Sequence, residues 1–198
     1  MANLRTNNLS GEQGQNAIRG SLGFHGSENS TDYLQIGSAG DFNYLHDGTS
    51  DWTAEFFVRS DQLNHRQTVF STGGNSSSIG FACRIMEDGS TGGSNGYKVF
   101  CQFSRGASGN YLGFEGGVID NKDFSHVALV FTTSNKQLAI YINGQLTNSS
   151  DLDGTAANTF GSGDFSSSNS TYAFTIGREN FGTTLYMDSG FISNLRIV

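Results

Sequence analysis

Residues 124–146 alternate apolar and polar side chains in two short runs. Every second residue of each run is apolar: Val127, Leu129 and Phe131 in the first, and Leu138, Ile140 and Ile142 in the second. A period of two is typical of strands that bury one face. The polar residues 133–135 lie between the runs, so the pattern predicts a β-hairpin. The Asn143-Gly144 pair tolerates positive φ and predicts another turn after the second run.

Short apolar runs separated by turns rich in Gly, Ser and Asn continue over the rest of the chain. Besides the hairpin, the predicted strands are residues 22–24, 33–36, 53–59, 68–71, 79–86, 97–103, 111–114, 173–176 and 191–197. No segment has the pattern of a long helix. Many short strands joined by such turns predict an all-β fold, a two-sheet antiparallel jelly-roll sandwich.

The 198 residues fit one domain of this kind, with 16 Phe and 7 Tyr to fill its core. Trp52 begins an alternating strand and lies on the same face of it as Phe56 and Val58, which predicts a place in the core.

Residues 1–20 are polar and without periodicity, so we expect an N-terminal arm held by its own sandwich or by a neighbouring subunit. The sandwich domain then spans residues 21–198.

The charge of the chain excludes some classes of partner. A formal charge of −7 and a pI near 4.9 argue against electrostatic nucleic-acid binding, which needs a basic surface. No run reaches the ~18 apolar residues of a membrane span, so no membrane insertion is expected. The first residues also lack a signal-peptide pattern, and we expect synthesis in the cytoplasm without a cleaved secretion signal.

The two cysteines, Cys83 and Cys101, lie in neighbouring predicted strands that can pair as a long hairpin. Such pairing brings the thiols close together. Because cytoplasmic proteins keep their cysteines reduced, we expect free buried thiols, with a disulfide as the alternative.

Five segments in a fixed order resemble a known family. They are SLGFHGSENSTDYLQIG, DWTAEFFVRS, FSHVALVFTTSNKQLAIYINGQL, FTIGREN and GFISNLRIV. Together they resemble the concanavalin A-like lectin/glucanase superfamily, specifically its laminin-G-like branch, over about residues 20–198. The resemblance implies a jelly-roll sandwich that works as a lectin-like binding domain or as a glucanase.

The opening MANLRTNNLSGEQGQNAIRGSLGFHG resembles virion proteins of tailed phages, notably phages of marine bacteria and cyanobacteria. In those proteins laminin-G-like domains decorate capsids or tails. A phage protein is made in the host cytoplasm and released by lysis, which agrees with the absent signal peptide. This resemblance implies a location in the virion and partners among capsid or tail proteins.

The residues argue against a glucanase. Retaining glycoside hydrolysis needs two carboxyl groups about 5 to 5.5 Å apart, which the glucanase branch supplies as Glu-x-Asp-x-x-Glu on one strand. Here Glu87 and Asp88 are adjacent, and Glu55 stands alone in a Phe-rich strand. No Ser or Cys has the setting of a nucleophile near a His. We therefore predict no enzymatic activity and no catalytic residues.

Cofactors are not expected, although related lectins and laminin G domains often hold Ca²⁺ at the rim through Asp and Asn side chains. The candidate loops contain Asp151 and Asp153 in one case, and Asp41, Asp47 and Asp51 in the other. Neither spacing provides a full ligand set. Solvated turn aspartates are the favoured interpretation, so no metal ligand is assigned.

Sugar binding by stacking requires exposed aromatic rings at the rim. The rings close to turn-rich segments are Tyr44, Tyr111, Phe160, Phe165, Phe181 and Tyr186, and most are expected to pack against the core or an edge. The polar residues 161–171 predict a rim loop of the kind that carries binding function. The sequence assigns no individual ligand-binding residue.

These observations favour a non-enzymatic structural protein of a tailed-phage virion, either a capsid decoration protein or a tail-associated protein. Its outward loops would help adhesion to glycans on the host surface, and a symmetric shell favours a homo-oligomer. The alternative is a carbohydrate-binding, lectin-like module that acts free in solution.

Overall fold

The computed structural model describes residues 21–25, 33–61, 66–73, 78–87, 97–105, 111–120, 123–134, 137–147, 165–179, 185–187 and 189–198. The predicted arm, residues 1–20, lies outside these ranges, so the domain boundary at residue 20 stays a prediction. The elements are β1 (Ser21–His25), β2 (Leu34–Ile36), the 3₁₀ helix η1 (Asn43–Leu45), β3 (Trp52–Ser60), β4 (Gln67–Ser71), β5 (Ile79–Glu87), β6 (Tyr97–Arg105), β7 (Tyr111–Ile119), β8 (Ser125–Thr132), β9 (Gln137–Ile142), β10 (Gln145–Leu146), β11 (Phe174–Ile176) and β12 (Ser189–Ile197).

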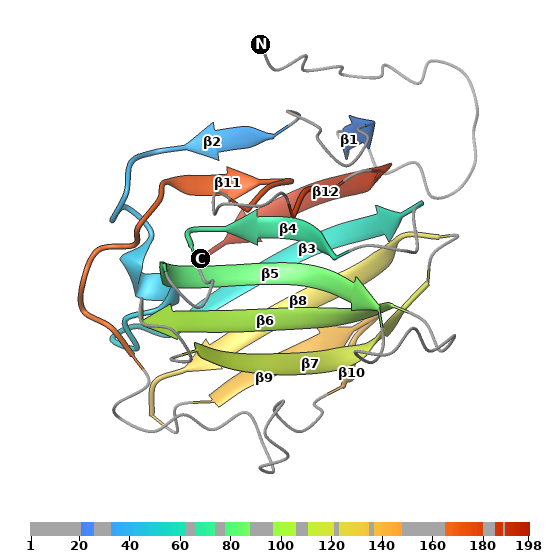
Figure 1. Ribbon diagram of the computed structural model, residues 1–198. Helices are drawn as coiled ribbons and strands as arrows, with labels where there is room; N and C mark the ends of the chain where they lie inside the picture. The colour runs from blue at the N-terminus through green and yellow to red at the C-terminus, as the bar shows by residue number, and fades with distance from the viewer. Residues whose placement is uncertain are drawn as a thin grey trace.

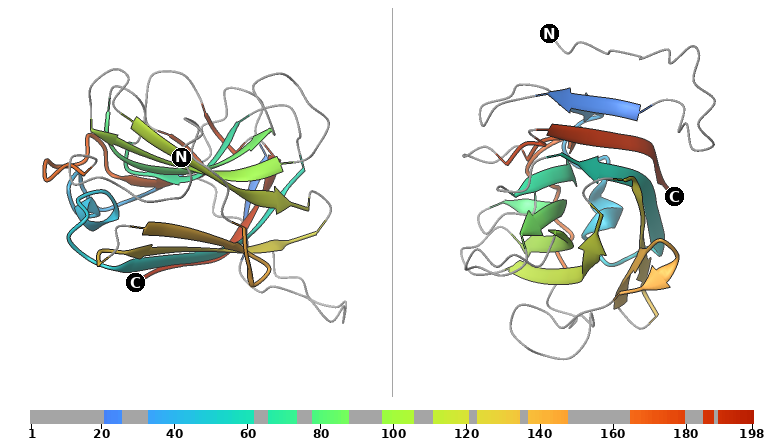
Figure 2. Two further views of the ribbon diagram at one scale, coloured as in Figure 1. Left: turned by 90° about the horizontal axis from the view of Figure 1, so that it is seen from below. Right: turned by 90° about the vertical axis from the view of Figure 1, so that its right-hand side faces the viewer.

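The strands form two antiparallel sheets that face each other (Figures 1 and 2). The front sheet, nearest the viewer in Figure 1, has the order β2-β11-β4-β5-β6-β7. The back sheet has the order β1-β12-β3-β8-β9-β10. This arrangement confirms the predicted all-β sandwich. Among the described residues, no helix is long and apolar enough to span a bilayer.

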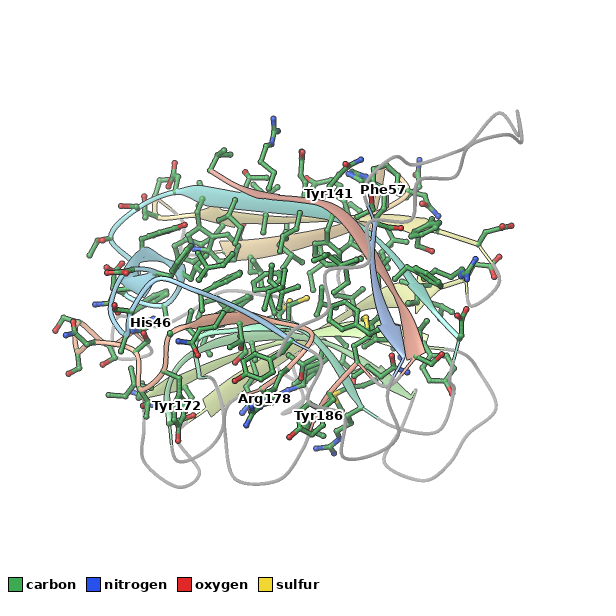
Figure 3. The ribbon with its side chains drawn as sticks, turned by 90° about the horizontal axis from the view of Figure 1, so that it is seen from above. His46, Phe57, Tyr141, Tyr172, Arg178 and Tyr186 are labelled. Carbon is green, nitrogen blue, oxygen red and sulfur yellow. The ribbon has the colours of Figure 1, made fainter. Side chains whose placement is uncertain are left out.

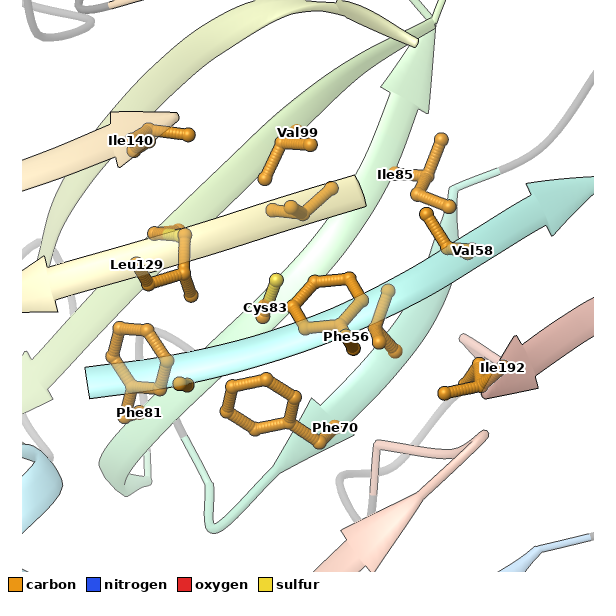
Figure 4. Packing of buried hydrophobic residues seen from close by; sticks show 14 of the residues in the cluster. Phe56, Val58, Phe70, Phe81, Cys83, Ile85, Val99, Leu129, Ile140 and Ile192 are labelled. Carbon is orange, nitrogen blue, oxygen red and sulfur yellow. The ribbon is translucent and has the colours of Figure 1, made fainter. Parts of the chain in front are cut away.

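The core lies between the sheets, and alternate residues of the strands point into it. In β3, Trp52, Ala54, Phe56 and Val58 are buried while the residues between them are only partly covered. Aromatic rings from both sheets meet across the gap. The ring centroids of Trp52 and Phe81 are 5.4 Å apart, and those of Phe56 and Phe70, both labelled in Figure 4, are 6.0 Å apart. Trp52 is 2% exposed, which confirms the prediction that it is a core residue.

The hairpin predicted from residues 124–146 is present as β8 and β9. Leu129 pairs with Ile140 and Val127 pairs with Ile142, so the apolar residues share the core face. Asn143 and Gly144 both adopt positive φ, 51° and 79°, and turn the chain into β10. The turn was predicted, but the two-residue strand after it was not.

Strand β7 is longer than predicted, because residues 115–119 continue the pairing with β6. The glycines Gly116 and Gly117 resemble a turn in the sequence, but here they allow a close approach between strands. A Cβ on Gly116 would lie 2.6 Å from Ile140 Cγ2 on β9. The sandwich therefore closes tightly at this edge, where only glycine fits.

Cys83 and Cys101 occupy directly opposite positions on β5 and β6. Both side chains are free thiols and completely buried, as predicted. Burial and the neighbouring Cys83 raise the pKa of the Cys101 thiol well above its usual value.

Candidate functional site

The outer side of the front sheet carries polar side chains that are nevertheless buried. On β5, Cys83 and Ile85 belong to the core, so Arg84 between them points outward. Thr68 on β4 is the register partner of Arg84, and Gln102 lies on β6 between two core residues. Thr68, Arg84, Gln102 and the buried carboxylate of Glu179 form a set that we call the polar face.

A buried ion pair organises the polar face. Glu179 Oε2 accepts a hydrogen bond from Arg84 Nε at 2.7 Å, and Arg84 Nη2 forms an ion pair with the same oxygen at 2.7 Å. Arg84 Nη1 also donates to the side-chain oxygen of Gln102. The side chains of Arg84 and Glu179 are 4% and 2% exposed. Because burial outweighs the attraction of Arg84 and Arg66, the pKa of Glu179 is raised.

The polar face retains unused hydrogen-bonding capacity. Glu179 Oε1 and Thr68 Oγ1 are buried and have no hydrogen-bond partner among the described residues. An unsatisfied buried polar atom costs about 1 to 3 kcal/mol, so native proteins keep few of them. The two atoms therefore leave hydrogen-bonding capacity on the outer side of the front sheet that the described residues do not use.

At the β2 and β11 edge of the same sheet, an arginine lies against two tyrosine rings. The Arg178 guanidinium carbon is 4.5 Å from the ring centroid of Tyr33 and 5.4 Å from that of Tyr186. All three side chains are half-buried. We call this group the arginine clamp. Figure 3 shows Arg178 and Tyr186 on the outer side of the front sheet, away from the core.

Backbone contacts hold the clamp in place. Arg178 and Tyr186 form an isolated antiparallel bridge. On either side of it, Glu179 N donates to Leu185 O at 3.0 Å and Met187 N donates to Gly177 O at 2.9 Å. Because Met187 is completely buried in the core, the bridge is anchored to the sandwich.

Of the rings predicted at the rim, Tyr186 belongs to the clamp, whereas Tyr44 and Phe165 pack against the core. Phe165 lies 5.6 Å from Phe131, and Tyr44 lies 6.0 Å from Phe42. Phe160 and Phe181, with the side chain of Tyr111, lie outside what the structure describes.

The aspartates of the candidate calcium loop act separately. Asp41 Oδ2 accepts a hydrogen bond from Ser38 N, and Asp47 Oδ1 accepts from Thr49 N and Oγ1. Asp51 Oδ1 accepts from both donors of Thr133, which lowers the pKa of Asp51. Over the described residues, no three His, Cys, Asp or Glu side chains are grouped for a metal ion. Asp151 and Asp153 lie outside these residues.

The described part of the predicted rim loop, residues 165–171, is attached to η1. Asn43 Oδ1 accepts a hydrogen bond from Ser170 N at 2.9 Å, and Asn43 Nδ2 donates to Asn169 Oδ1 at 2.8 Å. His46 Nε2 lies 3.1 Å from Ser168 O. This stretch is therefore part of the folded rim, with exposed side chains only at residues 167–169 and 171.

The candidate acidic residues do not form a catalytic pair in the described structure. Glu55 is on the back sheet and pairs with Arg196 at 2.9 Å. The side chain of Glu87 and all of Asp88 lie outside the described residues. Glu179, which the sequence did not single out, is held by Arg84.

On the back sheet, a second arginine, Arg59, also lies against two aromatic rings. The Arg59 guanidinium lies 4.5 Å from the Phe191 ring and 5.7 Å from the Phe124 ring. Unlike Arg178, Arg59 is paired with a carboxylate: Nε and Nη2 donate to the two oxygens of Asp61 at 3.0 and 3.4 Å.

Sequence comparison identifies a family. Residues 28–198 match the laminin G family model described as the concanavalin A-like lectin/glucanases superfamily. No curated protein matches the sequence.

Three solved structures share the fold at low identity. Domains LG4-5 of the mouse laminin alpha1 chain are 13% identical, with a TM-score of 0.52, over 90% of this chain and 41% of that one. The CBM40 of the Ruminococcus gnavus IT-sialidase is 20% identical, with a TM-score of 0.51, over 86% and 91%. The heptameric SAP-like pentraxin from Limulus polyphemus is 15% identical, with a TM-score of 0.50, over 89% and 74%.

Proposed function

Because the chain belongs to the concanavalin A-like lectin/glucanase superfamily, we propose that it is a non-enzymatic carbohydrate-binding module. The ligand surface is the arginine clamp at the β2 and β11 edge of the front sheet, and the buried polar face lies beside it on the outer side of the same sheet. A saccharide offers flat apolar patches together with a dense set of hydroxyl groups, so its receptor needs aromatic rings beside hydrogen-bonding side chains.

The observation that carries this proposal is the pair of half-buried rings, Tyr33 and Tyr186, next to the polar face. Neither tyrosine hydroxyl makes a hydrogen bond with another described residue, and in our proposal both bind the ligand. The fold neighbours include a CBM40, which agrees with a binding role but assigns no ligand to this chain.

A glycan array followed by calorimetry tests the proposal. Tyr33→Ala and Tyr186→Ala should each weaken binding of the best glycan about 2- to 10-fold, since aromatic ring contacts contribute about 0.5 to 1.5 kcal/mol each. Phe57→Ala and Tyr141→Ala are matched controls on the back sheet, on the opposite side of the molecule in Figure 3. Equal losses from both sheets, or no glycan bound by the wild type, would contradict the proposal.

A second proposal concerns where the module acts. The resemblance of residues 1–26 to virion proteins of tailed phages supports a role as a capsid decoration or tail-associated protein, in which the module contacts host-surface glycans. Residues 1–20 would then attach the domain to capsid or tail proteins, and symmetric docking favours a homo-oligomer.

This second proposal has a direct test. The full chain should co-sediment with particles of its phage at a saturating copy number, whereas a chain without residues 1–19 should stay soluble and folded but fail to attach. Normal attachment of the truncated chain would contradict the role of the arm. A full chain that binds glycans but no particles would leave only the free lectin-like module.

A further inference from the structure

We propose that the arginine clamp is a carboxylate receptor, so that the glycan bound by this module is an acidic one. The inference rests on the proposed function and adds the chemical class of the ligand. It also assigns a specific role to Arg178, whose guanidinium would bind the carboxylate of a uronic acid or a similar acidic sugar.

The first argument is that Arg178 has no carboxylate partner among the described residues. Four other basic residues in the described structure have a carboxylate within 4.0 Å, namely Arg59, Arg84, Lys98 and Arg196. Arg178 has no such partner within the described residues. An arginine is always charged at neutral pH, and a protein with a net charge of −7 contains ample carboxylates to pair it. The lack of a partner leaves this cation open to an anion from outside.

The second argument is geometry. Contacts with Tyr33 and Tyr186 restrict the guanidinium, and Arg178 Nε is buried without a hydrogen-bond partner among the described residues. The two terminal nitrogens therefore form the edge that a ligand can reach. A planar guanidinium binds the two oxygens of a carboxylate with paired hydrogen bonds, and aromatic contacts pre-organise it for this.

Arg59 shows the same arrangement with its anion in place. It also lies against two aromatic rings, and Asp61 meets its free edge with both oxygens. The distance from guanidinium to the nearer ring is 4.5 Å in both clusters. Arg178 thus has the ring contacts of Arg59 but lacks the carboxylate, which in our proposal comes from the ligand.

The local charge on this side of the sheet agrees with an anionic ligand. Glu179 is the carboxylate next in sequence to Arg178, and its Oε2 is already engaged by Arg84. Arg66 also lies close enough to favour the charged form of Glu179. Among the described residues, Glu179 is thus the carboxylate that faces both Arg84 and Arg66, and it is not an ion-pair partner of Arg178.

Calorimetry with paired oligosaccharides tests the inference. The probes are oligogalacturonate, oligoglucuronate and oligomannuronate, each beside its carboxyl-reduced neutral counterpart, and a sulfated galactan oligosaccharide of similar length. We expect the full chain to bind at least one uronate at least tenfold more tightly than its reduced form. The sulfated oligosaccharide should bind more weakly than that uronate.

Variants then assign the effect to the clamp. Arg178→Ala should weaken uronate binding about 10- to 100-fold, the range for losing charge-assisted hydrogen bonds. Arg178→Lys should restore part of it, because the charge remains but the planar pair of donors is lost. Arg59→Lys, the matched control in the other ring cluster, should leave binding unchanged. Thermal unfolding of each variant confirms that it is folded.

The outcomes separate this inference from the proposed function. Binding of neutral oligosaccharides with no gain from the carboxylate would overturn the carboxylate receptor and leave the carbohydrate-binding module intact. Equal binding of the sulfated probe, or an Arg178→Ala variant with unchanged uronate affinity, would also overturn the inference. If the chain binds no saccharide of either kind, both proposals fail.

Discussion

Arg84 on β5 and Glu179, 95 residues later in the sequence, form a buried ion pair at 2.7 Å on the outer side of the front sheet. Its position is unusual, because both charges are almost completely covered although they lie outside the main core. The pair connects the middle of the sheet to the segment that carries Arg178. Its integrity therefore bears on both stability and binding.

Removing one partner of this pair should be costly. We expect Arg84→Met or Glu179→Leu alone to lower the free energy of unfolding by about 3 to 5 kcal/mol, because each leaves a buried charge without its partner. The double variant should recover part of that loss. Denaturant unfolding of the three variants measures the coupling, and additive losses would show that the two side chains do not stabilise each other.

The burial of His46 makes stability sensitive to acid. Burial lowers the pKa of His46 below its usual value of 6.5, and Nδ1 has no partner among the described residues. As pH falls below about 6.5 the unfolded chain takes up a proton first, so the folded state loses stability down to the lowered pKa. Above 6.5 this contribution is constant.

The variant His46→Gln should flatten that part of the profile. The difference in unfolding free energy between wild type and variant should shrink as pH falls from about 7 to 5, and urea unfolding at several pH values measures it. His126→Gln, at a half-exposed position on the back sheet, is the matched control. A pH-independent difference for His46→Gln would contradict the prediction.

Gly177 should not tolerate a side chain. Its φ is 81°, and a Cβ there would lie 2.1 Å from Cε1 of Phe24, a core residue. Gly177→Ala should therefore destabilise the domain by about 1 to 3 kcal/mol through strain and overpacking. It should also reduce glycan affinity, because Arg178 follows directly. Gly144→Ala has a similar φ but open space around it, and it separates backbone strain from crowding.

The thiols of Cys83 and Cys101 should be unreactive in the folded protein. Both are buried, and the raised pKa of Cys101 keeps it in the thiol form, which is a poor nucleophile. Alkylation at pH 8 should be slow for the native chain and rapid in denaturant, as mass spectrometry can follow. Fast alkylation of the native chain would show that the β5-β6 region opens readily.

The prediction from sequence worked best where side-chain period alone carries the information. The alternation in β3, β8 and β9 identified the buried face, and Trp52 was correctly placed in the core. The length of β7 was missed because its glycines resemble a turn. Their role becomes visible only in the folded chain, where Ile140 lies against Gly116 and Thr147 lies against Gly117.

The candidate site was much harder to predict. Of the clamp, the sequence indicates only Tyr186, as one of six rings near turns. Tyr33 was assigned to a strand, and nothing in the local sequence distinguishes Arg178 from other surface arginines. Arg84 and Glu179 occur in different segments without a shared motif, so no local pattern signals their contact.

The sequence by itself determined the all-β class, the two-layer sandwich and most strand positions, because these follow from a period of two and from turn chemistry that neighbouring residues express. Only the tertiary structure decided which polar side chains share a surface. The pairing of β11 with β2 and β4 brings Tyr33, Arg178 and Tyr186 together across about 150 residues of chain. Such long-range contacts depend on the packing of the whole sheet, and the residues that make them follow no local rule.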